Sequence, residues 1–190
     1  MKTPLIIVSV MVLVVVGWLL ISNTGQHQNM NSNSNNTQTD SSTTAEKAPD
    51  FALQDYNDNT VRLADFAGKP FVINSWAAWC PFCRKELGAF AAAQKEFGDD
   101  ITIIAIDRAE SREAAKKYTD ELGITNGLIF LLDPSDSFYQ SIGGFSMPET
   151  IFVDGNGNIA ERKRGLMEIN EIRQKIQKLL SPEHEKASTK

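Results

Sequence analysis

The sequence predicts an α/β fold in which helices flank a mixed sheet. Apolar runs that suit buried strands alternate with amphipathic stretches of helical period, as parallel strands joined by crossover helices require. A Gly-Asn-Gly turn near the C-terminal end joins two further strand-like runs and predicts an antiparallel hairpin. At 190 residues, of which 42% are hydrophobic, the chain has room for one well-packed domain.

The first predicted elements begin where the composition becomes globular, at Pro49. Residues 51–63 read as a strand, an Asn/Asp turn and a second strand. The continuous apolar run at 71–76 (FVINSW) is typical of a strand that is buried on both faces. Residues 84–97 then predict a helix. The apolar face of this helix consists of Leu87, Phe90, Ala91 and Phe97.

The second half continues the alternation. Residues 101–107 and 128–133 predict two more buried strands. The segment between them predicts a helix with Ser111 as its N-cap and Gly123 just past its end. Residues 146–165 contain a proline followed by the two strands and the Gly-Asn-Gly turn of the predicted hairpin. A last amphipathic helix carries Ile169, Ile172, Ile176, Leu179 and Leu180 on its apolar face.

Residues 1–21 are predicted to form a transmembrane signal-anchor, because the stretch from 5 to 21 is apolar except for one serine and one glycine. Lys2 precedes this run and the next basic residue is Lys47, which places the short N-terminus in the cytoplasm. The expected location is therefore the cell membrane, crossed once, with the catalytic domain on the extracytoplasmic side, where disulfides persist. A cleaved signal peptide is the alternative, although no A-x-A pattern follows the run.

The remaining boundaries follow from composition. Residues 22–48 consist mostly of Asn, Gln, Ser and Thr and predict a disordered tether, since they cannot bury a core. The folded domain is expected at 49–181 and a flexible tail at 182–190. The net charge is −5 and the basic residues are scattered, so nucleic acid is excluded as a partner.

Cys80 and Cys83 are the two cysteines of the chain, in a CPFC sequence between a predicted strand and a predicted helix. At the first turn of a helix, unpaired N–H groups and the helix dipole stabilise a thiolate, which makes Cys80 the candidate nucleophile. Cys83, one turn later, can resolve a mixed disulfide. Pro81 suits the first helical positions, and Phe82 makes the rim of the site apolar. No cofactor is needed besides the redox-active Cys80–Cys83 disulfide.

The cysteine pair is compatible with three other readings. A structural zinc site needs four ligands, but the only histidines are His27 in the tether and His184 in the tail, so no metal site is predicted. A soft-metal-binding module or metallochaperone, holding a metal such as Cu(I) through the two sulfurs, is a different class of function. Two inert buried thiols would leave the placement between strand and helix unexplained.

Several motifs together carry a resemblance to a known family. They are the APDF opening, the LADFAGKP stretch, the WAAWCPFCRKEL centre and the Met147-Pro148 pair before a strand. Over about residues 48–180 the chain resembles the thioredoxin-like superfamily, and more narrowly the TlpA/ResA-type membrane-anchored thiol-disulfide oxidoreductases with a redoxin or AhpC/TSA-like domain. The resemblance implies a thioredoxin-like fold with an N-terminal β-hairpin and a central helix-strand insertion.

The resemblance also implies roles for particular residues. Pro148 matches the family's cis-proline, beside which a client chain lies, and Glu86 matches a glutamate linked to proton handling at the cysteines. The competing reading of Glu86 is an exposed residue near a helix N-terminus. Asn74 stands where a cytoplasmic thioredoxin has a buried aspartate, so proton transfer has to come from elsewhere. The expected docking surface for a client consists of Trp79, Pro81, Phe82, Met147 and Pro148.

The implied activity is reduction of protein disulfides. The implied partners are clients with disulfides or thiols, apocytochrome c in cytochrome c maturation among them, and a membrane thiol electron donor. The Pro-Phe dipeptide between the cysteines leaves the direction of electron flow open, so a disulfide-donating oxidase is an alternative. A peroxiredoxin-like peroxidase is another, although Ala77 stands where that activity needs threonine or serine.

Overall fold

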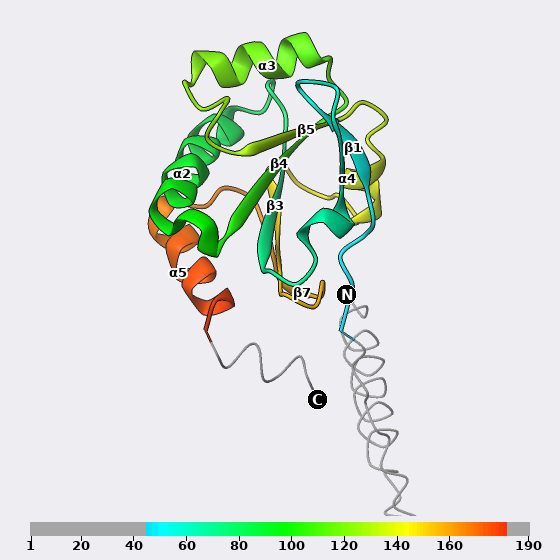
Figure 1. The fold of residues 1–190 in the computed structure, drawn as a ribbon. Helices are drawn as coiled ribbons and strands as arrows, with labels where there is room; N and C mark the ends of the chain where they lie inside the picture. The colour runs from blue at the N-terminus through cyan, green and yellow to red at the C-terminus, as the bar shows by residue number, and fades with distance from the viewer. Residues whose placement is uncertain (1–44, 182–190) are drawn as a thin grey trace, which may run out of the picture. The chain divides into compact units, whose positions relative to one another are not determined.

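The computed structural model describes residues 45–181, which form a seven-stranded mixed sheet with helices on both faces (Figure 1). The strands are β1 Ala52–Asp55, β2 Thr60–Arg62, β3 Phe71–Trp76, β4 Thr102–Arg108, β5 Ile129–Asp133, β6 Glu149–Val153 and β7 Ile159–Arg164. The helices are α2 Pro81–Phe97, α3 Arg112–Glu121, α4 Ser137–Ser141 and α5 Ile169–Leu179, with the 3-10 helices η1 Leu63–Phe66 and η2 Gly98–Asp100.

The strand order is β2-β1-β5-β4-β3-β6-β7. The central strands β3, β4 and β5 are parallel. Antiparallel strands extend the sheet on both sides, β1 and β2 beyond β5, and β6 and β7 beyond β3. The predicted α/β class, the N-terminal hairpin and the inserted α3–β5 unit are thereby confirmed, and the connections between parallel strands are helical, as that topology requires.

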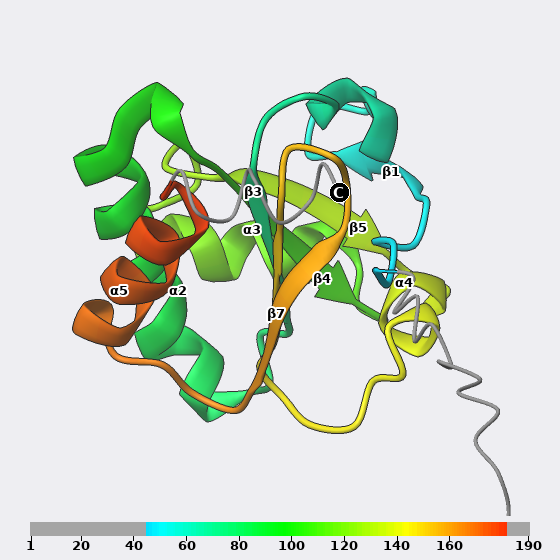
Figure 2. The ribbon, with the colours of Figure 1, turned by 90° about the horizontal axis from the view of Figure 1, so that it is seen from below.

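Side-chain alternation along β3 separates two apolar layers. Val72 and Trp76 face α2, α3 and α5, whereas Phe71 and Ile73 face η1 and α4. Figure 2 shows α2 and α5 together on one side of the sheet and α4 on the other. Because β3 is covered on both faces, all six of its residues are buried, as its continuous apolar sequence predicts.

The apolar face of α2 differs slightly from the predicted one. Leu87 and Phe90 are buried as expected, but Ala91 and Phe97 are only half-buried, and Ala93 is buried as well. The buried face of α2 is set by two neighbours, the sheet below and α5 beside it, so it is turned relative to a face that packs on a sheet alone.

The short helix α4 was not predicted. It begins after β5 because the carboxylate of Asp133 accepts the backbone N–H groups of Ser137, at 3.0 Å, and Phe138, at 2.8 Å. A side-chain cap of this kind satisfies N–H groups that have no partner within the helix. A helix of five residues leaves no periodic signal in the sequence.

The chain enters the domain beside β7. The N–H of Ile159 donates to the carbonyl of Glu46 at 2.7 Å, and the N–H of Ala48 donates to Gly157 at 3.0 Å. Packed structure therefore begins a few residues before the expected start at 49. Within residues 45–181 no helix is long and apolar enough to cross a membrane. The predicted anchor at 1–21, most of the predicted tether and the predicted tail lie outside the described residues.

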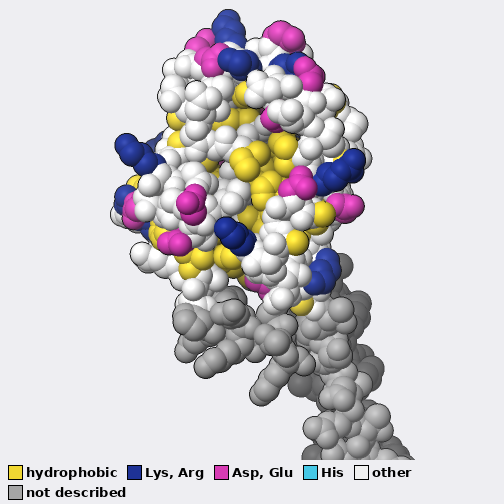
Figure 3. Space-filling view, in the orientation of Figure 1, with side chains coloured by type: hydrophobic (Ala, Val, Ile, Leu, Met, Phe, Trp, Pro, Cys, Tyr) yellow, Lys and Arg dark blue, Asp and Glu magenta, His cyan; other side chains and the backbone are white. Residues whose placement is uncertain are grey.

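The face shown in Figure 3 carries apolar side chains near its centre, with basic and acidic side chains interspersed around them. On this face no stripe of one charge sign runs across the surface. A continuous basic stripe is the feature by which nucleic-acid-binding domains hold phosphate groups.

Candidate active site

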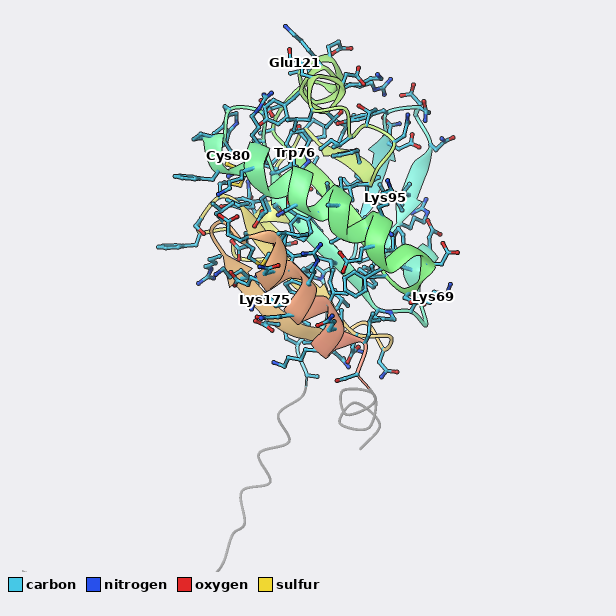
Figure 4. All side chains as sticks on the ribbon, turned by 90° about the vertical axis from the view of Figure 1, so that its left-hand side faces the viewer. Lys69, Trp76, Cys80, Lys95, Glu121 and Lys175 are labelled. Atoms are coloured by element: carbon cyan, nitrogen blue, oxygen red, sulfur yellow. A yellow bond between two sulfur atoms is a disulfide. The ribbon has the colours of Figure 1, made fainter. Side chains whose placement is uncertain are left out.

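The candidate active site lies where β3 ends and α2 begins (Figure 4). Cys80 is the N-cap of α2, with extended backbone, and Pro81 is the first helical residue. Proline fits there because the first N–H groups of a helix have no intrahelical partner. The unpaired N–H groups and the helix dipole point at the Cys80 sulfur, an arrangement that favours negative charge on it.

Cys80 and Cys83 are joined by a disulfide bond, as predicted. The Cys83 N–H also donates to Cys80 Sγ, with 3.2 Å between nitrogen and sulfur. Cys80 is 2% exposed and Cys83 is fully buried, so the two cysteines differ little in burial in the disulfide form. A client thiol or disulfide must therefore pass the side chains around Cys80 to reach its sulfur.

Glu86 lies one turn after Cys83 on the buried side of α2. Its Oε2 accepts the side-chain amide of Asn74 and its Oε1 accepts the N–H of Met167, both at 2.8 Å. Burial raises the pKa of Glu86 to about 7, although the two hydrogen bonds act in the opposite direction. The reading of Glu86 as an exposed helix residue is wrong, because the loop before α5 covers this turn of α2.

Asn74 is the residue that connects Glu86 to the sheet. Its side-chain nitrogen donates to Glu86 and to the Thr150 hydroxyl, at 2.8 and 3.0 Å. Asn74 has no ionisable group of its own, but its hydrogen bond holds the Glu86 carboxyl in place near the end of β3. The ionisable group next to this position of the sheet therefore comes from α2 and not from β3.

The Met147–Pro148 peptide bond is cis, which confirms the expectation from the resemblance. Pro148 is buried and directly precedes β6, the antiparallel neighbour of β3. Met147 is half-buried and packs against the cluster that contains both cysteines. Two segments more than 60 residues apart in sequence are thus brought together at one end of the sheet, as the predicted docking surface requires.

Three aromatic side chains at this end of the molecule are exposed. Trp79 and Phe82 are 61% and 58% exposed on either side of Cys80, and Pro81 is exposed between them. Phe145, which was not predicted, is 81% exposed in the loop before Pro148. We call Trp79, Phe82 and Phe145 the aromatic rim. Exposed aromatic side chains of this size are the residues that most often anchor a protein partner.

Contacts beneath Phe145 fix its loop. The Phe145 N–H donates to Oε2 of the buried Glu149 at 3.1 Å, and the Arg164 guanidinium lies 5.5 Å from the centre of the Phe145 ring. Glu149 in turn pairs with Arg162 and Arg164. The only sequence signal for Phe145 is its place in the GGFS run before Met147-Pro148, and nothing in that run predicts that the ring faces solvent.

Comparison with known proteins agrees with this geometry. The model of the AhpC/TSA family matches residues 44–162. The thioredoxin-like protein YneN of Bacillus subtilis is 31% identical over 132 residues, covering 69% of this chain and 77% of that protein. The thiol-disulfide oxidoreductase ResA of Geobacillus thermodenitrificans is 27% identical over 136 residues, with 70% and 75% of the two chains covered.

Solved structures give the same result at the level of the fold. The exposed lipoprotein thioredoxin of Streptococcus pneumoniae superimposes with a TM-score of 0.60 and 29% identity, over 69% of this chain and all of that one. A thiol:disulfide interchange protein of the thioredoxin family from Chlorobium tepidum gives 0.64 at 22% identity, over 72% and 97% of the two chains. The sheet order and the position of the helices are therefore those of thioredoxin-like domains.

Proposed function

The chain belongs to the AhpC/TSA family and has a thioredoxin-like fold, and on this premise we propose that it is a thiol-disulfide oxidoreductase that reduces protein disulfides. The observation that carries the proposal is the Cys80–Cys83 disulfide at the N-terminus of α2, beside the cis-proline loop. The family relatives that are named for an activity are thiol-disulfide oxidoreductases and disulfide interchange proteins.

The reaction starts from the reduced pair. The Cys80 thiolate attacks one sulfur of a client disulfide, a mixed disulfide forms, and the other client sulfur leaves as a thiolate. Cys83 then loses its proton and attacks Cys80 Sγ, which releases the second client thiol and forms the Cys80–Cys83 disulfide. Two electrons pass to the client, and a dithiol donor has to reduce the pair again before the next cycle.

Glu86 is the proposed acceptor of the Cys83 proton. It lies three residues after Cys83 on the same buried face of α2, where solvent cannot easily serve as base. Because burial brings the pKa of Glu86 to about 7, the carboxyl is partly ionised at neutral pH and can both accept and return a proton. Asn74 holds the carboxyl in its orientation through the 2.8 Å hydrogen bond.

The aromatic rim and Pro148 are the proposed docking surface for the client. Trp79 and Phe82 flank Cys80 in sequence, and Met147 joins the cysteine cluster from the other side. A client chain that buries these exposed rings would gain apolar contact area next to the reacting sulfur. A peroxidase receives no support from the site, because Ala77 has no hydroxyl to offer a peroxide near Cys80.

The finer assignment follows from the family resemblance and from the predicted anchor. We propose an extracytoplasmic enzyme held at the cell membrane by residues 1–21, with apocytochrome c among its clients and a membrane thiol protein as its electron donor. The support for this location is the apolar run after Lys2, the Asn/Ser-rich stretch that follows it, and the ResA and DsbE names of the relatives.

Trapping tests the proposed function. Cells that produce the full chain with Cys83→Ser should accumulate mixed disulfides through Cys80, because the resolving thiol is missing. The adducts should disappear on treatment with dithiothreitol and should be absent from the Cys80→Ser and the doubly substituted controls. Mass spectrometry of the adducts names the clients. A folded Cys83→Ser protein that traps no partner would contradict the proposal.

The direction of electron flow needs its own measurement. Equilibration of the pair with a series of glutathione buffers gives the reduction potential, and a reductase requires a potential well below that of the cell envelope oxidants. A value near the roughly −120 mV of a strong periplasmic oxidant would reverse the direction and make the protein a disulfide donor.

A further inference from the structure

A second buried carboxyl lies behind the disulfide, and the reaction described above does not use it. Asp107, near the end of β4, is 1% exposed, and its carboxyl group lies within hydrogen-bonding reach of the Glu110 side chain. The sheet register places Asp107 directly beside Trp76, the last residue of β3. Trp76 belongs to the same packed cluster as Cys80 and Cys83 (Figure 4).

Glu110 connects this region to the loop in front of Cys80. Its Oε2 accepts the backbone N–H of Ala78 at 2.6 Å, across 32 residues of sequence. Ala78 lies in the short loop between β3 and α2, two residues before Cys80. Ala109, just before Glu110, has a φ of 56°, which a non-glycine residue adopts at a cost of about 1 kcal/mol. This turn directs the chain after β4 back toward the loop.

Negative groups dominate the surroundings of Asp107. Burial raises the pKa of Asp107 to about 9, and the side-chain hydrogen bond with Glu110 and the charges of Glu110 and Asp133 raise it further. Asp107 therefore holds a proton at neutral pH. The titratable or charged residues at this end of the sheet are Tyr56 in the β1–β2 turn, Glu110, Asp133 in β5, Tyr118 in α3, and Cys80, Cys83 and Arg84 at the start of α2.

We propose that Glu110 is a positioning residue for the redox reaction: it holds the loop that presents Cys80 by accepting the Ala78 N–H, and a hydrogen bond with Asp107 supports the Glu110 side chain from behind. Carboxylates in close proximity repel one another when both are ionised and poorly solvated. Loss of the Asp107 proton at alkaline pH therefore weakens the hold on Ala78. The loop then relaxes, and Cys80 loses its placement against the N-terminus of α2.

The inference rests on the proposed function in one respect, the assignment of Cys80 as the attacking thiol. The test measures the rate of alkylation of Cys80 by iodoacetamide in the reduced full-length protein from pH 5 to pH 10, with the modified cysteine identified by peptide mass spectrometry. Only the thiolate reacts, so the rate follows its ionisation. Alkylation at Cys83 in place of Cys80 would overturn the assignment and the inference with it.

Variants of Glu110 test the positioning role. Glu110→Ala should slow alkylation at pH 7 about fivefold, because the loop loses one hydrogen bond. Glu110→Gln should stay near the wild-type rate, because the amide oxygen can still accept the Ala78 N–H. Glu121→Ala, which removes an exposed carboxylate at the other end of α3, is the matched control and should change nothing. Equal profiles for Glu110→Ala and wild type, with Cys80 alkylated in both, would overturn the inference alone.

Asp107→Asn tests the role of the proton. The wild-type rate should fall from its plateau above about pH 9, as Asp107 ionises, whereas Asp107→Asn should keep the plateau. A decline that persists in a folded Asp107→Asn protein would overturn this part of the proposal. Circular dichroism checks whether each variant folds. If Asp107→Asn does not fold, the alkylation profile of Glu110→Gln provides the test. This variant has no charge opposite Asp107, so its rate should also stay at the plateau at high pH.

Discussion

The side-chain amide of Asn74 donates to Oε2 of Glu86 at 2.8 Å, and both side chains are fully buried. One residue comes from the strand before the cysteines and the other from the helix after them. The contact places an ionisable group at the point where the sheet, α2 and the loop before α5 meet. Because this contact lies within the domain, proton transfer at the site can be tested without knowing the client.

The first prediction concerns stability and pH. The folded-state pKa of Glu86, about 7, lies above its ordinary value of 4.5, so the charged form destabilises the fold. The contribution of Glu86 to the free energy of unfolding is fully present below pH 4.5 and is lost as the pH rises through 7. Compared with Glu86→Gln, the wild type should lose up to about 3 kcal/mol of unfolding free energy between pH 4.5 and pH 8. Urea unfolding at both values measures this, and parallel pH dependences would contradict it.

The second prediction concerns catalysis. Glu86→Gln keeps an oxygen that can accept the Met167 N–H but cannot take a proton from Cys83. Turnover of a disulfide substrate such as insulin, with excess dithiothreitol, should fall by about 100-fold at pH 7. The inflection near pH 7 in the rate profile should disappear with it. A variant that keeps that inflection would assign it to another group.

The third prediction changes the partner of the carboxyl. The hydrogen bond from Asn74 favours the charged form of Glu86, so Asn74→Ala should raise the pKa of Glu86 above its value of about 7. The inflection in the rate profile should move to higher pH by about one pH unit. Thr150→Val, which removes the other partner of Asn74, is the control and should move the inflection less. A shift to lower pH after Asn74→Ala would contradict the assigned sign.

The fourth prediction concerns the aromatic rim. Phe145 is 81% exposed and belongs to the proposed docking surface, so Phe145→Ala should raise KM for a protein client about fivefold and leave kcat nearly unchanged. Phe145→Leu should restore part of the affinity. The thiolate reactivity of Cys80 toward iodoacetamide should not change. A fall in kcat with constant KM would show that Phe145 acts on the chemistry and not on docking.

The sequence was sufficient to predict the alternating elements and the cysteine pair, because both are local signals: buried strands, helical periodicity and a CPFC motif at a strand-helix junction. The cis-proline followed from the family resemblance. The burial of Glu86 could not be predicted, since a glutamate in the second turn of a helix is equally compatible with solvent. Its environment is made by Asn74 and by Met167, 81 residues further along the chain.

The same reason applies to the residues that were missed. Whether Phe145 faces solvent depends on how its loop is held by Glu149 and Arg164, on strands β6 and β7. The bond from Ala78 to Glu110 depends on the turn at Ala109, whose positive φ is not a preference of alanine. Short-range patterns predict elements, whereas these contacts exist only after the elements have packed.

The entry of the chain beside β7 has a consequence for how the enzyme would meet its clients. Register through β3, β6 and β7 places Glu46 and Ile159 level with the start of β3, and Cys80 lies beyond its far end. The six residues of β3 separate these two ends of the sheet by about 20 Å. The chain therefore enters the domain at the end of the sheet opposite to the disulfide, so its point of entry leaves the surface around Cys80 clear for a client.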